Sequence, residues 1–237
     1  MNRRTIWKRI GALFLAALLF AQTASPAIAQ TPPPPVRRIA LTFDDGPTEY
    51  TRRLLDALAA RDVQATFFVL GSRVVERPDL AARIVAEGHE IGNHSLWHPD
   101  LTAMSAAGVR NQIRWTNDII EWATGVRPVV FRPPYGWNNR TVRTIAAEFD
   151  FPLVLWSVDT RDWEVKRVDA ILHHIADGDR VRIREWDIIL MHDRFETTVD
   201  AAALAVDLLL EAGFTFVTVS ELLAEREDEV RAGRVYR

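Results

Sequence analysis

The chain has 237 residues, of which 48% are hydrophobic and 26% charged, with a formal net charge of -3 and no cysteine. A chain of this length and apolar content can bury one sizeable core, so we expect a single folded domain. The slight negative charge disfavours a nucleic-acid-binding protein. The lack of cysteine excludes disulfides, thiolate metal ligands and a cysteine-linked lipid anchor.

The first 29 residues have the order of a secretory signal peptide. Four basic residues lie within the first nine, an apolar run follows at residues 13–21, and Ala27-Ile28-Ala29 offers a small-x-small cleavage pattern. We therefore expect cleavage after Ala29 and an exported protein, periplasmic or extracellular in a bacterium, without a stable membrane span after cleavage. The apolar run is shorter than the roughly 20 residues of a spanning helix, and an uncleaved anchor is the alternative. Residues 30–36, rich in proline, predict an extended linker.

From residue 37 onward, short β-rich runs alternate with amphipathic helical runs. The predicted strands are residues 39–43, 65–70, 89–92, 128–131, 153–158, 187–191 and 214–219. The predicted helices are residues 50–61, 80–87, 106–122, 140–149 and 198–212, and the charge-rich tail at 221–237 predicts a solvated final helix. Such alternation gives parallel strands covered by helices, and about seven units favour an α/β barrel over an open sheet. No glycine-rich phosphate-binding loop is present in the sequence, which disfavours a nucleotide-binding protein.

Two adjacent carboxylates, Asp44 and Asp45, follow the first predicted strand and precede a Gly-Pro turn. Neighbouring residues of an extended segment point to opposite sides, so the pair can serve two different purposes. Gly46 permits backbone angles that other residues avoid, and Pro47 stiffens the exit from the strand. Taken alone, an Asp-Asp-Gly-Pro sequence is typical of a solvated strand end.

The later strands also end in residues of the kinds that bind metals or catalyse reactions. In a parallel α/β barrel, the loops at the carboxyl ends of the strands meet at one mouth, where sites are built. The residues concerned are His94 and His98 after the third strand, residues 132–135 after the fourth, Asp159 and Asp162 after the fifth, and His192 after the sixth. Their convergence predicts a single functional site.

His94 and His98 are spaced by one helical turn, which allows both imidazoles to face one cation. A carboxylate from a neighbouring loop would complete a set of two histidines and one acid. Three protein ligands leave a coordination position open for water or substrate, as a catalytic zinc site requires. Nitrogen and oxygen ligands also suit cobalt, nickel, manganese or iron, so the ligand types alone do not select the metal.

Five motifs occur in order along the chain. They are Thr42-Phe43-Asp44-Asp45-Gly46-Pro47, His94-Ser95-x-x-His98, Arg132-Pro133-Pro134-Tyr135, Asp159-x-x-Asp162-Trp163 and Leu190-x-His192. Together, over residues 37–223, they resemble the motifs of the polysaccharide deacetylase family, the family 4 carbohydrate esterases with a NodB-type domain. The resemblance implies an α/β fold, a distorted (β/α)7 barrel in a single domain, with the catalytic domain at residues 37–237.

The resemblance implies a metal centre and a base beside it. Asp45, His94 and His98 would hold a divalent metal, with Zn2+ as the first choice and Co2+, Ni2+ or Mn2+ as alternatives. Asp44 would be the general base that takes a proton from the attacking water. Arg132 would keep that carboxylate ionised and correctly oriented.

The resemblance also implies the groups that serve the departing half of the substrate. His192 would be the general acid that protonates the leaving nitrogen, and Asp162 would raise the imidazole pKa and fix its tautomer. The backbone N–H of Tyr135 would help to stabilise the oxyanion. Trp163 and Leu190 would line the pocket for the acetyl methyl group.

These features predict a metal-dependent hydrolase that removes N-acetyl groups from polysaccharides or oligosaccharides containing N-acetylglucosamine, such as chitin-like chains or peptidoglycan. The alternatives are an O-acetyl esterase on xylan-type polysaccharide, a hydrolase of small amides, and a non-catalytic carbohydrate-binding envelope protein. The expected partner is the acetylated glycan, with no nucleic acid, and the oligomeric state stays open. We expect structural roles for His89 and Asp159, and packing rather than sugar stacking for Trp97 and Trp137.

Overall fold

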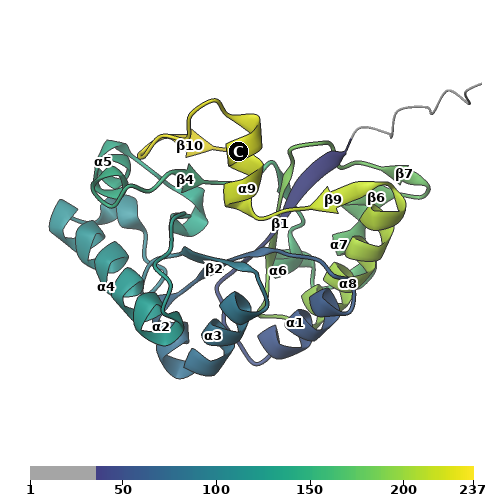
Figure 1. Cartoon of the computed structure of the whole chain (residues 1–237), viewed down its shortest axis with the longest axis horizontal. Coiled ribbons are helices and arrows are strands. Elements are labelled where there is room, and N and C mark those ends of the chain that lie inside the picture. The colour runs from purple at the N-terminus through teal and green to yellow at the C-terminus, as the bar shows by residue number, and fades with distance from the viewer. Residues whose placement is uncertain (1–35) are drawn as a thin grey trace, which may run out of the picture. The chain divides into compact units, whose positions relative to one another are not determined.

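A parallel β-sheet forms the centre of the computed structural model, which describes residues 36–237 (Figure 1). The predicted signal peptide and residues 30–35 of the predicted linker lie outside the described residues. Six strands form this sheet, in the order β3–β2–β1–β8–β5 with β9 beside β1, and all its ladders are parallel. Their bounds are β1 Arg37–Asp44, β2 Thr66–Val69, β3 Glu90–Asn93, β5 Val158–Asp159, β8 Ile188–His192 and β9 Phe214–Phe216.

The strand array continues beyond β3 through single bridging residues. Phe131 makes parallel bridges to Asn93 and to Leu153. Leu153 begins β4 (Leu153–Val154), which pairs in parallel with β10 (Val235–Tyr236). The strand positions β1, β2, β3, Phe131, β4, β5 and β8 therefore follow one another around the core. This arrangement is the distorted seven-stranded α/β barrel expected from the sequence.

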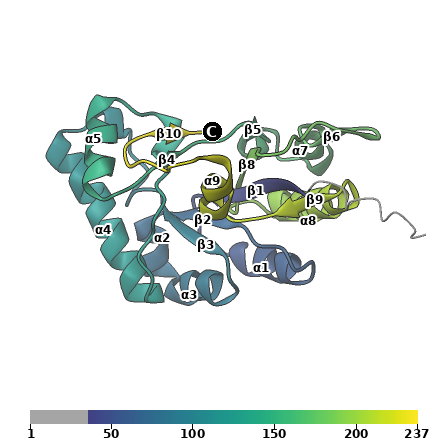
Figure 2. The same ribbon diagram turned by 45° about the horizontal axis from the view of Figure 1, so that its top comes forward.

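Helices lie outside the strands, as the alternating pattern predicts. Figures 1 and 2 both show α4 and α5 on the side of β4, and Figure 2 shows α7 and β6 on the side of β5. In α1, Leu54, Leu55 and Leu58 are buried against the sheet, as their spacing requires. The larger helices are α1 Thr51–Ala59, α2 Gly71–Glu76, α3 Pro78–Ala86, α4 Ala106–Thr124, α5 Arg140–Glu148, α8 Glu196–Glu211 and α9 Val219–Arg226.

Two stacked aromatic rings pack between the sheet and its helices, in one cluster with Leu54 and Leu58 of α1. Phe43 of β1 and Phe67 of β2 are both almost fully buried, and their ring centroids lie 5.3 Å apart. Burial of a side chain of this size contributes roughly 1.5–3 kcal/mol relative to exposure. Because Phe43 directly precedes Asp44, this packing fixes the point where β1 delivers its two carboxylates.

The predicted strand at residues 153–158 is in fact two short strands, β4 and β5. The buried guanidinium of Arg132 accounts for the break, because it donates to the carbonyl oxygens of Val154 and Leu155, each at 3.0 Å. The prediction for residues 128–131 was too long as well, since only Phe131 makes a ladder contact. The carbonyl oxygens of Val154 and Leu155 therefore hold the guanidinium of Arg132 at the site.

The C-terminal tail differs from the predicted solvated helix. β9 ends at Phe216 because Thr218 begins α9 with a capping box, in which its side chain and that of Glu221 satisfy each other's backbone N–H groups. Leu222 and Leu223 of α9 are buried, and Tyr236 of β10 is 2% exposed. The tail therefore completes the core beside β4.

Several short elements were not predicted at all. They are α2 Gly71–Glu76, α6 Asp162–Val165, the antiparallel strands β6 Ala176–Asp177 and β7 Arg180–Val181, and the 3-10 helices Leu101–Ala103 and Pro134–Gly136; the short helix α7 spans Val168–His173. Each is shorter than the window over which a periodic pattern can be read. Within residues 36–237, no helix is long and apolar enough to cross a membrane.

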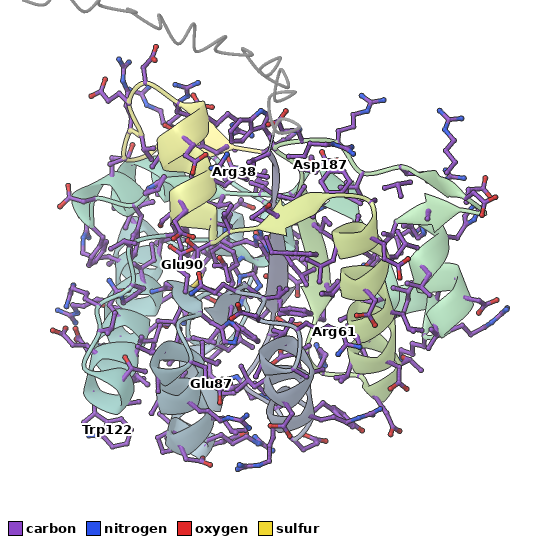
Figure 3. The ribbon with its side chains drawn as sticks, turned by 45° about the vertical axis from the view of Figure 1, so that its right-hand side comes forward. Arg38, Arg61, Glu87, Glu90, Trp122 and Asp187 are labelled. Carbon is purple, nitrogen blue, oxygen red and sulfur yellow. The ribbon has the colours of Figure 1, made fainter. Side chains whose placement is uncertain are left out.

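Glu90, the first residue of β3, stabilises the end of the barrel at which the strands begin (Figure 3). Its carboxylate accepts hydrogen bonds from the hydroxyl of Thr66 at 2.8 Å and from the backbone N–H of Ser220 at 3.2 Å. Burial raises the pKa of Glu90, while these hydrogen bonds oppose the rise. Glu90 thus ties the first turn of α9 to the sheet, at the opposite end from the polar strand ends.

Candidate active site

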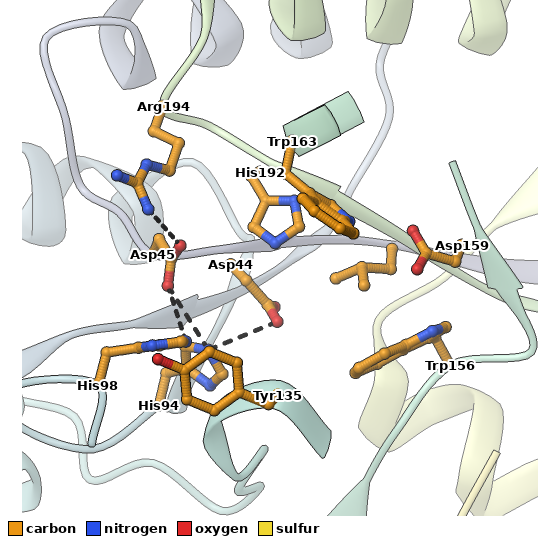
Figure 4. A pocket seen from close by; sticks show the side chains of 11 residues that line it. Asp44, Asp45, His94, His98, Tyr135, Trp156, Asp159, Trp163, His192 and Arg194 are labelled. Carbon is orange, nitrogen blue, oxygen red and sulfur yellow. Dashed lines mark hydrogen bonds and ion pairs between the residues drawn. The ribbon is translucent and has the colours of Figure 1, made fainter. Parts of the chain in front are cut away.

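The polar strand ends surround one cavity of about 400 Å³ (Figure 4). Its walls come from the loops after β1, β3, Phe131, β5 and β8, so the five polar segments noted in the sequence do meet. The lining residues are Asp44, Asp45, His94, His98, Tyr135, Trp156, Asp159, Trp163, Leu190, His192 and Arg194. Arg132 and Asp162 stand directly behind this lining, Arg132 in contact with Asp44 and His94, and Asp162 in contact with His192.

Asp44 is paired with Arg132 in the interior. Arg132 is 0% exposed, and its Nη1 lies 2.7 Å from Asp44 Oδ1 and 2.8 Å from the hydroxyl of Thr42. Burial lowers the pKa of Arg132, and the adjacent carboxylate opposes this change. A guanidinium keeps its proton even so. The pair therefore presents an ionised and immobile carboxylate to the cavity.

Replacing Arg132 with methionine is expected to lower the free energy of unfolding by about 3–5 kcal/mol, because Asp44 would remain as an unpaired buried charge. Chemical denaturation of the wild type and variant measures this loss. The double variant Arg132→Met/Asp44→Asn is the control, since it removes both charges and should recover part of the stability. A loss below about 1 kcal/mol for the single variant would contradict a buried pair.

Asp45 and the two histidines form a compact donor cluster. Asp45 Oδ1 lies 3.6 Å from His94 Nε2 and 3.5 Å from His98 Nε2, and one ligand atom from each residue lies within 4.8 Å of the others. These separations are too long for good hydrogen bonds. Asp45 Oδ1 is buried and has no hydrogen-bond partner among the described residues. A buried oxygen without a partner is costly unless another group satisfies it.

The tautomer of His94 supports the same conclusion. His94 Nδ1 lies 2.7 Å from the carbonyl oxygen of Arg132. A carbonyl only accepts, so Nδ1 carries the proton and the neutral ring turns the lone pair of Nε2 toward Asp45. A backbone carbonyl that orients the outer nitrogen is the usual support of a metal-binding histidine. The residues present therefore fit a divalent cation bound by two imidazoles and one carboxylate.

The pKa directions in the cluster favour the forms that bind cations. Burial alone would raise the pKa of Asp45, but three imidazoles and a hydrogen bond from Arg194 together lower it. Burial lowers the pKa of His98, the neighbouring His94 acts in the same direction, and the carboxylates of Asp45 and Asp44 oppose the change. An ionised carboxylate and neutral imidazoles are the protonation states that metal binding needs.

The rings of His94 and His98 do meet, but the expected reason, a spacing of one helical turn, was wrong. The segment after β3 is a loop, not a helix, with left-handed backbone angles at Ser95 (φ 72) and His98 (φ 59). Gln112 of α4 secures the loop, because its side-chain oxygen accepts the N–H groups of Leu96 and Trp97. The ring centroids of the two histidines are 5.0 Å apart.

His192, at the end of β8, is held by Asp162. His192 Nδ1 donates to Asp162 Oδ1 at 2.8 Å, and the other carboxylate oxygen accepts the backbone N–H of His192 at 2.7 Å and the hydroxyl of Thr198 at 2.8 Å. Burial alone would lower the pKa of His192. The hydrogen bond and charge of Asp162, with smaller contributions from Asp44 and Asp45, raise it to about 9 instead. The ring is therefore protonated at neutral pH, with Nε2 free for the cavity.

The remaining predicted residues form the aromatic and apolar walls. Tyr135 has a left-handed backbone (φ 60), its N–H makes no hydrogen bond with residues 36–237, and its ring lies against that of His98. Trp163 and Leu190 line the cavity, and Figure 4 shows Trp163 beside His192. Trp137 is 53% exposed and its ring centroid lies 4.7 Å from that of Tyr135, so the expectation of a packed Trp137 was wrong. Trp97 is also exposed.

His89 and Asp159, for which we expected structural roles, both make hydrogen bonds to the backbone. His89 is buried, and its Nδ1 accepts the backbone N–H of Ala65 at 3.1 Å. Asp159 accepts the backbone N–H of Arg161 at 2.8 Å, which shapes the turn into α6, although it also lines the cavity. Burial lowers the pKa of His89 to about 4, so this ring stays neutral.

Two residues directly after His192 were missed. Asp193 is fully buried, accepts a hydrogen bond from the hydroxyl of Thr51, and faces the Cα of Gly46 so closely that any side chain there would collide with it. Burial raises the pKa of Asp193 to about 7. Arg194 Nη1 lies 2.9 Å from Asp45 Oδ2. Their position at a strand end, the rule that selected His192, was the available signal.

Comparison with known proteins agrees with this geometry. The family model described as polysaccharide deacetylase matches residues 31–154. A peptidoglycan-N-acetylglucosamine deacetylase of Listeria monocytogenes is 41% identical over 191 residues, which cover 80% of this chain and 40% of that protein. A peptidoglycan-N-acetylmuramic acid deacetylase of Bacillus subtilis is 41% identical over 198 residues, covering 81% of this chain and 40% of that protein. The chain thus spans 40% of the length of these two relatives.

A solved structure extends the likeness from sequence to fold. The structure of a peptidoglycan deacetylase from Bacillus subtilis has a TM-score of 0.75 and 40% sequence identity with this chain. The match covers 81% of this chain and 92% of that chain. With a family model that matches more than half of its residues and close likenesses in sequence and fold, this chain belongs to the polysaccharide deacetylase family.

Proposed function

We propose that this protein is an exported, metal-dependent deacetylase that removes N-acetyl groups from peptidoglycan or chitin-like glycans. One observation carries the proposal: a single cavity joins the Asp45–His94–His98 donor cluster, the Asp44–Arg132 pair and the His192–Asp162 pair. Metal-assisted amide hydrolysis combines a Lewis acid, a base and an acid. The relatives above, named for peptidoglycan, support a substrate outside the cytoplasmic membrane.

Asp45, His94 and His98 would hold the cation, with Zn2+ as the first choice for two nitrogens and one oxygen. A cation held there would supply Lewis-acid polarisation of the acetamide carbonyl and would lower the pKa of a bound water to about 7. Asp44, which Arg132 keeps ionised, accepts a proton from the attacking water as its oxygen bonds to the carbonyl carbon. The backbone N–H of Tyr135 donates to the carbonyl oxygen while negative charge develops on it.

Departure of the nitrogen is the second half of the reaction. Protonated His192 gives its Nε2 proton to the sugar nitrogen, and the carbon–nitrogen bond breaks to leave acetate and a free amine. Asp162 holds the ring through Nδ1, so Nε2 is the nitrogen that transfers the proton. Trp163 and Leu190 provide an apolar surface for the acetyl methyl group.

Acetate release from N-acetylglucosamine oligomers by the purified protein tests the proposal. We expect release that stops on chelation and returns with zinc or cobalt, and close to one bound cation per chain by elemental analysis. His98→Ala is the matched variant, because it removes one ligand from a partly exposed loop position and should lose both the cation and the activity. Full activity in the chelated protein would refute the mechanism, and a protein that binds no cation would favour a carbohydrate-binding role.

A further inference from the structure

Arg194 presents unused hydrogen-bond donors to the cavity. Its side chain is 48% exposed, and only Nη1 is engaged, with Asp45 Oδ2. Nε and Nη2 have no acceptor among residues 36–237, and no second acidic group lies within salt-bridge distance of the guanidinium there. Figure 4 shows that Arg194 approaches Asp45 from the side opposite His94 and His98. A guanidinium has five N–H donors in a fixed fork, so Arg194 can bind a further anion.

Lys166 is a second cation near Arg194, outside the set of residues that line the cavity. Its Nζ lies 4.8 Å from the ring centroid of Phe195, and the guanidinium carbon of Arg194 lies 5.6 Å from the same centroid. Lys166 is exposed and has no acidic partner within salt-bridge distance among the described residues. One aromatic ring therefore carries two cationic side chains, and we call Lys166, Arg194 and Phe195 the basic rim.

The charge on the opposite wall has the other sign. Asp159 lies across the cavity from Arg194 in Figure 4, beside Trp156. An anionic group on a bound sugar is repelled by Asp159 and attracted to the basic rim. One wall of the cavity is thus positively charged and the other negatively charged. This difference orients an anionic sugar but not a sugar with only neutral substituents.

We propose that the basic rim binds a carboxylate of the substrate itself, so that the site prefers N-acetylated sugars with a carboxyalkyl ether on the ring carbon next to the acetamido group. The muramic acid unit of peptidoglycan has this chemistry. The inference rests on the proposed deacetylase function and narrows its substrate class. A carboxylate on the neighbouring ring carbon stays close to the reacting acetamide. The group that binds this carboxylate must therefore also lie close to the acetamide. Arg194 does so, because it contacts Asp45 of the donor cluster directly.

A matched pair of substrates tests the proposal. One is an oligosaccharide with a central N-acetylmuramic acid, and the other is the same oligosaccharide with its lactyl carboxylate converted to the neutral amide. For the wild type we expect kcat/KM to be higher for the carboxylate by about tenfold or more, equivalent to about 1.4 kcal/mol. In Arg194→Met this ratio should fall close to one, and Arg194→Lys should retain part of it.

Arg184→Met is the control, because it removes an exposed cation that precedes β8 instead of following it. It should leave the substrate ratio unchanged. Calorimetry on the chelated proteins measures the binding of both oligosaccharides without turnover. The wild type should bind the carboxylate more tightly than the amide, and Arg194→Met should bind the two about equally.

Equal use and equal binding of the two substrates by the wild type would overturn the proposal while leaving the deacetylase function intact. The same holds for a ratio that survives in Arg194→Met. If acetate is released neither from these oligosaccharides nor from N-acetylglucosamine oligomers, the proposed function fails. The binding difference then decides separately whether the basic rim recognises the carboxylate.

Discussion

Asp44→Asn is expected to lower kcat for acetate release by about 10²–10⁴-fold, the usual contribution of a positioned general base. The asparagine side chain fills nearly the same volume but cannot accept a proton from water. The Oδ1 of Asp44 lies 2.7 Å from Arg132 Nη1, which fixes the orientation of this carboxylate. Single-turnover measurements of acetate release will show whether the loss lies in the chemical step.

The control for this variant must separate catalysis from folding and from cation binding. The midpoint of thermal unfolding and the cation content should be measured for Asp44→Asn, with cation content expected to stay near one per chain. Asp159→Asn removes a different carboxylate from the same cavity wall and should lower kcat by less than about tenfold. A kcat for Asp44→Asn close to that of the wild type would remove Asp44 from the mechanism.

The positions of the site residues were predictable because they depend on a local rule. Hydrophobic runs located the strands, and polar residues at their carboxyl ends had to meet once the strands were parallel. Asp44, His94 and His192 needed no knowledge of distant contacts to be selected. The rule did not say how each side chain would be held, which depends on residues far away in the sequence.

The features that were missed depend on such distant contacts. Arg132 interrupts the strand at residues 153–158 by binding two of its carbonyl oxygens, and no periodic pattern records this. Tyr236 belongs to the core only because β10 returns to β4. The His94–His98 pair met through left-handed loop residues, although the sequence spacing had suggested a helix. A correct residue selection therefore rested partly on an incorrect local geometry.

The proton affinity of His192 depends mainly on the carboxylate of Asp162, which makes the pH profile a direct test of the role of His192. His192 is useful as a general acid only while protonated, so activity is lost as the pH rises through its folded-state pKa. That pKa is raised to about 9, above the ordinary value of 6.5. The corresponding stability is fully present below pH 6.5 and is lost as the pH rises through 9. Removing the charge of Asp162 leaves burial, which favours the neutral ring.

Asp162→Asn is therefore expected to move the alkaline limb of kcat/KM toward acid by more than about one pH unit, and to lower activity at pH 8 far more than at pH 6. A bound cation also lowers the pKa of His192, but it does so in both proteins, so their difference carries the prediction. Thr198→Ala is the matched control, because it removes a hydrogen bond to Asp162 without removing the charge. The alkaline limb of kcat/KM for Thr198→Ala should shift much less than that for Asp162→Asn. An alkaline limb unchanged in Asp162→Asn would mean that the ionisation of another group limits the reaction, and His192 would lose its place as the acid.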